Sequence, residues 1–89
     1  MIFILWNIMI NGQVIELTRA ENIILNLLIE NKRIVTTYSE LSLYLFAREI
    51  NEYDYKNIIK VMERLRKKLK GILNIYTKQK VGYCLYEYW

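Results

Sequence analysis

The sequence predicts a single α+β domain in which a short antiparallel sheet precedes three helices and a closing β-hairpin. Three observations predict it: the turn signal Asn11-Gly12 before an alternating run, apolar residues at helical spacing in three later segments, and a hairpin pattern near the C-terminus. The 89 residues are 54% apolar, enough for one domain with a modest core. No proline, repeat or low-complexity stretch marks an internal boundary.

The N-terminal segments 2–10 and 13–17 are predicted to pair as antiparallel strands, because Asn11-Gly12 is a strong signal for a two-residue hairpin turn. A targeting segment is disfavoured there, since the opening lacks a positively charged region and a small-residue cleavage site. The apolar stretch is also too short to span a bilayer. We therefore expect a cytoplasmic protein with no membrane partner.

The first helix is predicted to begin at Thr18, which forms a capping box with Glu21 three residues later. The helix should run to about residue 31. Its apolar residues recur at helical spacing and predict one buried face: Ala20, Ile23, Ile24, Leu27 and Leu28.

A brief extended piece at residues 34 and 35 is expected before the second helix. Thr37 and Glu40 repeat the capping-box spacing, so this helix should begin there and run to about Phe46. The polar stretch 47–53 then forms a loop.

The third helix is predicted over residues 54–70, capped by Asp54 or Asn51. Its inner face is defined by apolar residues at helical spacing: Ile58, Val61, Met62, Leu65 and Leu69. Gly71 is well placed for the left-handed residue that often follows a helix.

Two strands near residues 73–77 and 82–86 should close the chain as a hairpin, in which Gly82 allows a tight backbone path and Tyr83 packs under the third helix. The order sheet, helix, strand, helix, helix, hairpin is that of a winged helix-turn-helix. The single domain, 1–89, divides into N-terminal strands, a three-helix core, and a wing hairpin with its tail: residues 1–17, 18–71 and 72–89.

The charge of the chain is concentrated in one region. The net charge is +4, and residues 56–80 hold nine Lys or Arg against one acid, Glu63. The chain has no histidine, one cysteine (Cys84) and three isolated glycines. These counts exclude a His-based metal site, a Cys-based zinc site, an internal disulfide and a Gly-rich phosphate loop. We therefore expect no metal, no cofactor and no enzymatic activity.

Helical geometry places Lys56, Lys60, Glu63 and Lys67 opposite the apolar stripe of the third helix. Cations at these positions can meet phosphates, where counterion release supplies most of the affinity for DNA. Arg64 on the flank of the helix can form a bidentate contact with a guanine edge, and Asn57 can pair with adenine. Each of these contacts contributes roughly 1–3 kcal/mol. Glu63 would repel phosphate but can accept from a cytosine amino group. The alternative is a solvated helix face, as in most charge runs.

Four segments resemble a known family: Glu16-Leu17-Thr18-x-x-Glu21, Glu40-Leu41, Arg64-Leu65-Arg66-Lys67-Lys68-Leu69 and Ile75-x-Thr77-x-x-x-x-Gly82-Tyr83-x-Leu85. Their order and spacing resemble the OmpR/PhoB-type winged-helix DNA-binding domain, the effector domain of response regulators, over about residues 13–86. Family members usually follow a phosphorylated receiver domain. These 89 residues have no room for one, so we expect a domain standing alone, without phosphotransfer inside the chain.

The resemblance implies that the third helix enters the major groove of double-stranded DNA and that the wing reaches the minor groove or its phosphates. By position, the groove-facing residues are Lys56, Asn57, Lys60 and Arg64, with Lys67 further along. The wing residues that would touch DNA are Thr77, Lys78, Gln79 and Lys80. Thr37 and Tyr38 fall where members contact phosphate, and loop 47–53 matches the segment through which some relatives touch RNA polymerase.

We expect a transcription regulator that binds duplex DNA sequence-specifically. The alternative is a winged-helix interaction module that binds another regulator or RNA polymerase with little DNA affinity of its own. Three positions depart from the family pattern, namely Ile59, Glu63 and Gln79. The apolar opening and the aromatic ending of the chain either cover each other or form the face of a homodimer, which would place two recognition helices on repeated half-sites.

Overall fold

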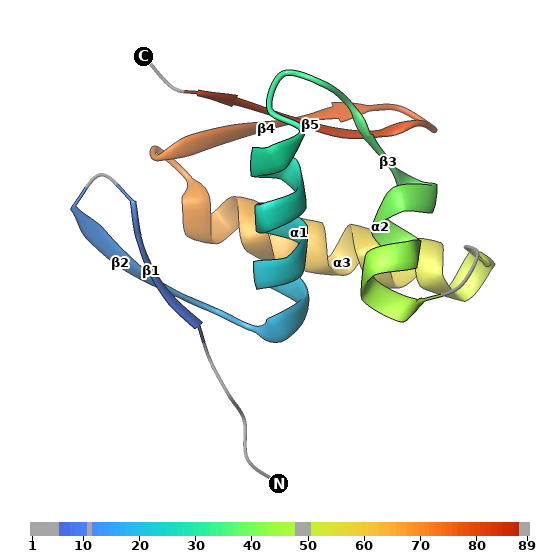
Figure 1. Cartoon of the computed structure of the whole chain (residues 1–89), viewed down its shortest axis with the longest axis horizontal. Helices are drawn as coiled ribbons and strands as arrows, with labels where there is room; N and C mark the ends of the chain where they lie inside the picture. The colour runs from blue at the N-terminus through green and yellow to red at the C-terminus, as the bar shows by residue number, and fades with distance from the viewer. Residues whose placement is uncertain (1–5, 11, 48–50, 88–89) are drawn as a thin grey trace, which may run out of the picture.

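The computed structural model describes residues 6–10, 12–47 and 51–87, and its elements follow the predicted order (Figure 1). They are β1 (Trp6–Ile10), β2 (Gln13–Leu17), α1 (Arg19–Glu30), β3 (Thr36–Thr37), α2 (Tyr38–Phe46), α3 (Glu52–Leu69), β4 (Leu73–Lys78) and β5 (Gly82–Glu87). The predicted strand residues 2–5, turn residue Asn11, loop residues 48–50 and tail residues 88–89 lie outside the described part of the chain. Within it, the α+β winged-helix architecture is confirmed.

The strands form two antiparallel sheets. In the first, β1 pairs with β2, so that Met9 lies opposite Val14 and Ile8 opposite Ile15. In the second, β5 lies between β3 and β4. Figure 1 shows the β4–β5 hairpin passing over the helices, while the β1–β2 hairpin stands to one side of α1. The second sheet thus ties the wing to the short strand that leads into α2.

Helix α1 begins with the predicted capping box. The Thr18 hydroxyl accepts from the Glu21 amide at 3.3 Å, and the Glu21 carboxylate accepts from the Thr18 amide at 2.8 Å. At the start of α2, the Thr37 hydroxyl accepts from the Glu40 amide at 3.2 Å. The Glu40 carboxylate accepts from Asn31 Nδ2, also at 3.2 Å. This side chain therefore links the start of α2 to the end of α1.

Two predicted boundaries need correction. The extended piece expected at residues 34–35 is the strand β3 at Thr36–Thr37, because the chain first makes a turn closed by a hydrogen bond of 2.7 Å from the Ile34 amide to the Asn31 carbonyl. Helix α3 begins at Glu52, two residues before the predicted start, because Asn51 is its cap. The Asn51 side chain accepts from the Asp54 amide at 2.9 Å.

The core lies between the three helices, with β2 and β5 contributing to it. The predicted inner face of α3 is confirmed, since all five of its apolar residues are buried: Ile58, Val61, Met62, Leu65 and Leu69. From α1 the buried residues include Ile24, Leu27 and Leu28, and β5 adds Tyr83 and Leu85. Burial of one complete face fixes which side of α3 remains available to a partner. No helix in the described part of the chain is long and apolar enough to cross a membrane.

Candidate nucleic-acid interface

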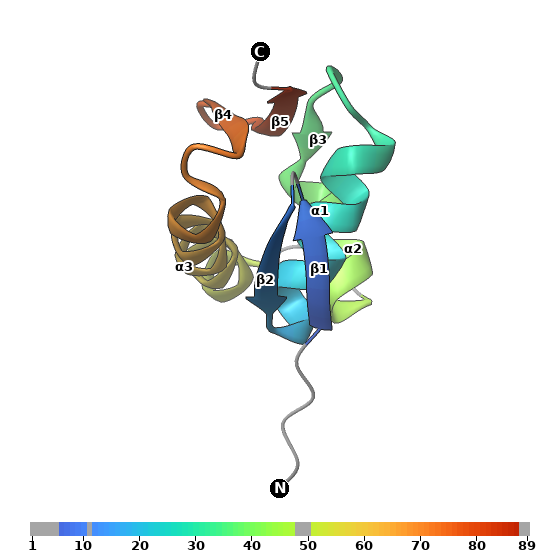
Figure 2. The same cartoon turned by 90° about the vertical axis from the view of Figure 1, so that its left-hand side faces the viewer.

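The outer face of α3 is polar and mostly cationic. Lys56, Lys60, Arg64 and Lys67 are exposed on it together with Glu63, while Asn57 is half-buried on its flank. Figure 2 shows α3 and the β4–β5 wing on one side of the molecule, with α1 and α2 on the other. The wing therefore lies beside α3, and its strand β5 also contacts α1 and Tyr38 of α2.

A groove lies along one flank of α3 and a crevice along the other. On one flank, a groove of about 580 Å³ is lined by Arg19, Leu45 and Phe46 of the first two helices, and by α3 residues that include Asn57 and Arg64. On the other flank, a crevice of about 220 Å³ separates α3 from the wing. Glu63 lines both hollows, so it lies on the crest of the outer face, between the helix cations and the wing.

The tip of the wing carries three of the four predicted wing residues. Lys78, Gln79 and Lys80 are exposed, and the turn is closed by a hydrogen bond of 3.0 Å from the Val81 amide to the Lys78 carbonyl. Within this turn, the backbone of Lys80 adopts a positive φ of 64°. Thr77, one step below the tip, is also exposed, and its hydroxyl accepts from the Arg66 guanidinium. The tip cations are thus accessible to a partner.

The two residues predicted at the start of α2 are placed differently from the exposed cations. Thr37 is half-buried and serves as the helix cap. Tyr38 is only 7% exposed, its hydroxyl lies 3.3 Å from the Tyr83 hydroxyl, and its ring is 4.2 Å from that of Tyr55. Burial raises the pKa of Tyr38, and the hydrogen bond with Tyr83 raises it further, so the phenol stays neutral at physiological pH. The structure gives Tyr38 a packing role.

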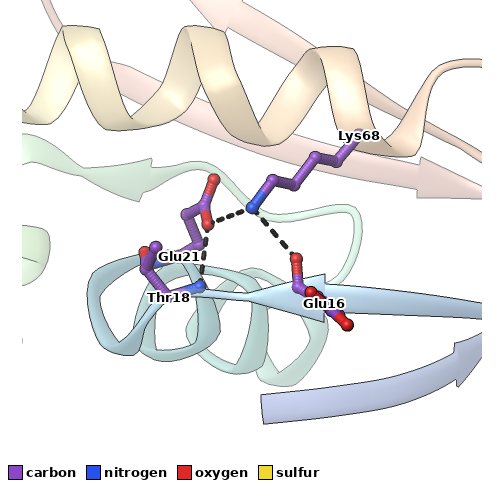
Figure 3. A network of polar contacts seen from close by, with 4 residues as sticks. All are labelled: Glu16, Thr18, Glu21 and Lys68. Carbon is purple, nitrogen blue, oxygen red and sulfur yellow. Dashed lines mark hydrogen bonds and ion pairs between the residues drawn. The ribbon is translucent and has the colours of Figure 1, made fainter. Parts of the chain in front are cut away.

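Lys68 belongs to the basic run but is used internally. Its Nζ donates to Glu21 Oε1 at 2.7 Å and to the Glu16 carbonyl at 2.9 Å (Figure 3). It thereby links the end of α3 to the capping box of α1 and to the end of β2. This internal role of Lys68 is additional to the roles predicted for the basic run. A signal was present, because at 100° per residue Lys68 falls beside the buried Leu65 rather than beside the exposed Lys67.

The Glu21 side chain is fully buried, and its carboxyl group forms an ion pair with Lys68. Burial raises the pKa of its carboxyl, but hydrogen bonds from Lys68 and Thr18 and the charge of Lys68 together outweigh burial and hold the pKa below its ordinary value of 4.5. The stabilisation from this carboxylate is therefore complete above about pH 4.5 and is lost as the pH falls through the lower pKa of the folded state.

We expect Glu21→Gln to be destabilised relative to the unaltered chain at pH 7, because Lys68 then loses its charged partner. The difference should be on the order of 1–2 kcal/mol, kept small because Lys68 remains 35% exposed. Urea unfolding followed from about pH 7 to about pH 3 should show this difference shrinking below about pH 4.5. A difference that stays constant across this range would contradict the assignment. The matched control is Glu30→Gln at the exposed end of α1, which should change stability by less than about 0.5 kcal/mol.

The described residues contain no cluster of acidic, histidine or cysteine side chains that could hold a metal ion. What they present is an amphipathic helix, cationic on its free side, beside a β-hairpin with a cationic tip. This combination defines the class of winged-helix DNA-binding domains.

The family described as "Transcriptional regulatory protein, C terminal" matches residues 12–85, and the chain belongs to this family of DNA-binding transcription regulator domains. The resemblance to OmpR/PhoB-type effector domains is thereby confirmed. Among solved structures, the chain is similar to the DNA-binding domain of Bacillus subtilis CssR, with 26% sequence identity and a TM-score of 0.73. That similarity covers 85% of this chain and 84% of the CssR chain. No curated protein matches the sequence.

Proposed function

We propose that the chain regulates transcription by binding double-stranded DNA sequence-specifically, with α3 in the major groove and the wing at the minor groove or its phosphates. The observation that carries the proposal is the outer face of α3, where Lys56, Lys60, Arg64 and Lys67 are exposed while the opposite face is buried. The major groove of B-DNA is about 12 Å wide and admits one α-helix. A helix with only one free face, cationic along its length, meets this requirement.

The residues of this face divide into two roles. Lys56, Lys60 and Lys67 contact phosphates, because an ammonium group binds phosphate as a point charge. Arg64 and Asn57, which line the same groove along α3, read base edges. Asn57 and Arg64 are seven positions apart, about 10 Å along the helix axis, which corresponds to roughly three base-pair steps. Arg64 suits guanine and Asn57 suits adenine.

Glu63 limits affinity and contributes to specificity. Its exposed carboxylate lies on the crest of α3, where it would repel a phosphate and accept from the amino group of cytosine. On DNA without a cytosine at this position, the Glu63 carboxylate loses its hydrating water and gains no hydrogen bond in return. The discrimination should be on the order of 1–3 kcal/mol.

At the wing, Lys78 and Lys80 contact phosphates, while Gln79 at the tip of the turn and the Thr77 hydroxyl add polar contacts to the DNA backbone. Thr37, at the start of α2, is a further phosphate contact. The Tyr38 side chain is left out of the proposed interface because it is buried.

The test is fluorescence anisotropy of the purified chain with mixed-sequence duplex DNA, titrated across salt. Five exposed cations of the helix and the wing are assigned to phosphates: Lys56, Lys60, Lys67, Lys78 and Lys80. If all five contact phosphates, the slope of log K against log salt should be about −4.5. Micromolar binding with a slope between about −3 and −5 supports the proposal and justifies selecting the preferred sequence. Absence of binding even at low salt would overturn it.

The second candidate function is protein interaction, and exposed apolar side chains just before segment 47–53 and at its end favour it. Leu43 and Tyr44 near the end of α2 and Tyr53 near the start of α3 are all exposed. RNA polymerase or another regulator is the proposed partner. If the chain shows no DNA binding in the salt titration, protein interaction through this surface becomes the proposed function of the domain. This interaction can be measured as binding of the chain to purified RNA polymerase.

Self-association is part of the proposal. Met9 and Val14 face each other on the outer side of the β1–β2 sheet and are 72% and 63% exposed. Strand β1 carries no charged residue to protect its outer edge. A dimer formed there would bring two copies of α3 to half-sites related by a two-fold axis.

We expect sedimentation velocity to show a dimer at high micromolar concentration. Met9→Lys should return the chain to a monomer, because a charge on the outer sheet face opposes apolar contact between copies. A chain that sediments only as a monomer at these concentrations would remove the dimer from the proposal.

A further inference from the structure

Arg66 lies within the basic run of α3, but its side chain turns away from the outer face. It is half-buried in the crevice between α3 and the wing, whereas its neighbour Lys67 is exposed. The guanidinium donates to the Thr77 hydroxyl of β4, and its carbon lies 5.5 Å from the centre of the Tyr83 ring of β5. One side chain of the helix therefore contacts both strands of the wing.

The two contacted residues form a single rung of the hairpin. Thr77 and Tyr83 are directly opposite each other in the β4–β5 register, and the next pair, Lys78 with Gly82, closes the tip. Arg66 thus holds the hairpin immediately below the tip cations. The wing pairs with β3 only through β5, at Thr36–Tyr83 and Thr37–Gly82, so β4 is an edge strand of the three-stranded sheet. The position of β4 relative to α3 therefore depends on side-chain contacts such as that between Arg66 and Thr77.

The contacts continue beyond Tyr83 and return to α3. The buried Tyr83 hydroxyl lies 3.3 Å from that of Tyr38, and the Tyr38 ring lies 4.2 Å from the ring of Tyr55. Tyr55 and Arg66 are eleven residues apart on α3, about 16 Å along its axis. The rung is consequently connected to α3 both directly, through Arg66, and indirectly, through Tyr38 of α2.

We propose that Arg66 is a positioning residue which, through the Thr77–Tyr83 rung, fixes the wing tip relative to α3, so that helix and wing reach adjacent grooves of DNA in one arrangement. The proposal rests on the proposed function for its effect on affinity. Its effect on the wing itself does not require DNA. Lys cannot replace Arg here, because an ammonium group lacks the planar guanidinium that donates to Thr77 while lying over the Tyr83 ring.

The sharpest test uses Thr77, because two substitutions there separate the hydrogen bond from strand propensity. Thr77→Ser keeps the hydroxyl, whereas Thr77→Val keeps the shape and favours a strand. If Arg66 positions the wing, hydrogen exchange of the wing in Thr77→Ser matches that of the unaltered chain, and Thr77→Val loosens the wing. If strand propensity alone determines how firmly the wing is held, Thr77→Val holds the wing more firmly than Thr77→Ser, and the proposal is overturned.

Hydrogen exchange of the free protein gives the first readout. We expect amides in 74–78 and 82–86 to exchange about tenfold faster in Thr77→Val and in Arg66→Lys, since each loses one hydrogen bond to a charged group. Amides of α1 should be unchanged. Equal exchange of the wing in Thr77→Val and in the unaltered chain would overturn the proposal, as would acceleration spread evenly over the chain.

DNA affinity gives the second readout. Thr77→Val should weaken binding about tenfold with an unchanged salt slope, and combining it with Arg66→Lys should add little. Two residues that contacted phosphate independently would instead show additive losses. The control Lys67→Gln should reduce the slope by about 0.9 and leave wing exchange unchanged. If the unaltered chain binds no DNA, the proposed function fails, while the exchange experiment still decides whether Arg66 holds the wing.

Discussion

Replacement of both Lys60 and Arg64 by Gln should weaken duplex DNA binding by a factor of about 100 to 1,000 at moderate salt. Lys60 would lose a phosphate contact and its released counterion, and Arg64 would lose a bidentate contact to a base edge that contributes roughly 1–3 kcal/mol. Both side chains are exposed, and Gln has nearly the helix propensity of Lys and Arg, so folding should be unaffected. Anisotropy titrations at several salt concentrations measure the loss.

The matched control removes the same two charges from another surface. Lys32→Gln with Arg33→Gln alters the turn after α1 and keeps a non-glycine residue at the positive φ of Arg33, so no new backbone strain is introduced. This variant should lose less than about threefold in affinity, because the turn is outside the proposed interface and salt screens distant charges. Equal losses in the two variants would show that net charge alone drives binding, and would contradict the assigned helix face.

The substitution Gly82→Ala should be the most destabilising change of one methyl group that the structure identifies. A Cβ atom at Gly82 would lie 1.9 Å from the Thr36 carbonyl oxygen and 2.8 Å from Thr37 Cα. Both are backbone atoms of β3, so the strands must separate and the pairing that joins the wing to α2 is lost. We expect a loss on the order of 3 kcal/mol or more, measured by urea unfolding or as a fall in Tm.

Gly71→Ala provides the comparison, because it adds the same methyl group where no atom lies within 4 Å. Its φ of 81° makes the substitution strained, and the expected loss is about 1 kcal/mol. A Gly82→Ala variant no less stable than Gly71→Ala would contradict the close approach of β5 to β3.

Features of the fold that depend on neighbours in the sequence could be predicted. The Thr18–Glu21 capping box, the inner face of α3 and the left-handed Gly71 after that helix all follow from spacings of a few residues. Strand β3 was misplaced by two residues because its position depends on pairing with β5, more than forty residues away. The start of α3 was ambiguous because both Asn51 and Asp54 have cap-forming side chains, and the sequence offers no means to choose between them.

The exposed positions of the candidate interface could be predicted to a similar degree. The exposure of Lys56, Lys60, Arg64 and Lys67 follows from helical periodicity, once the apolar stripe is recognised. The same run contains two cations with different roles, Arg66 at the wing and Lys68 at the capping box. Their partners are Thr77 and Glu21, from other elements, so helical periodicity can place Lys68 beside the buried face but cannot identify either partner. The number of Lys and Arg residues in a basic run of a small domain is therefore an upper limit on the number of cations that reach DNA.

The contact between Lys68 and Glu21 joins residues 47 positions apart and has a consequence for the order of folding. The local part of the capping box can form as soon as α1 forms, but its carboxylate stays hydrated until α3 docks and supplies the ammonium group. Burial of Glu21 before that moment would leave a charge without a partner in the interior. The first helix of the chain therefore cannot complete its packing before the last helix arrives, which couples the two ends of the helical core into one cooperative transition.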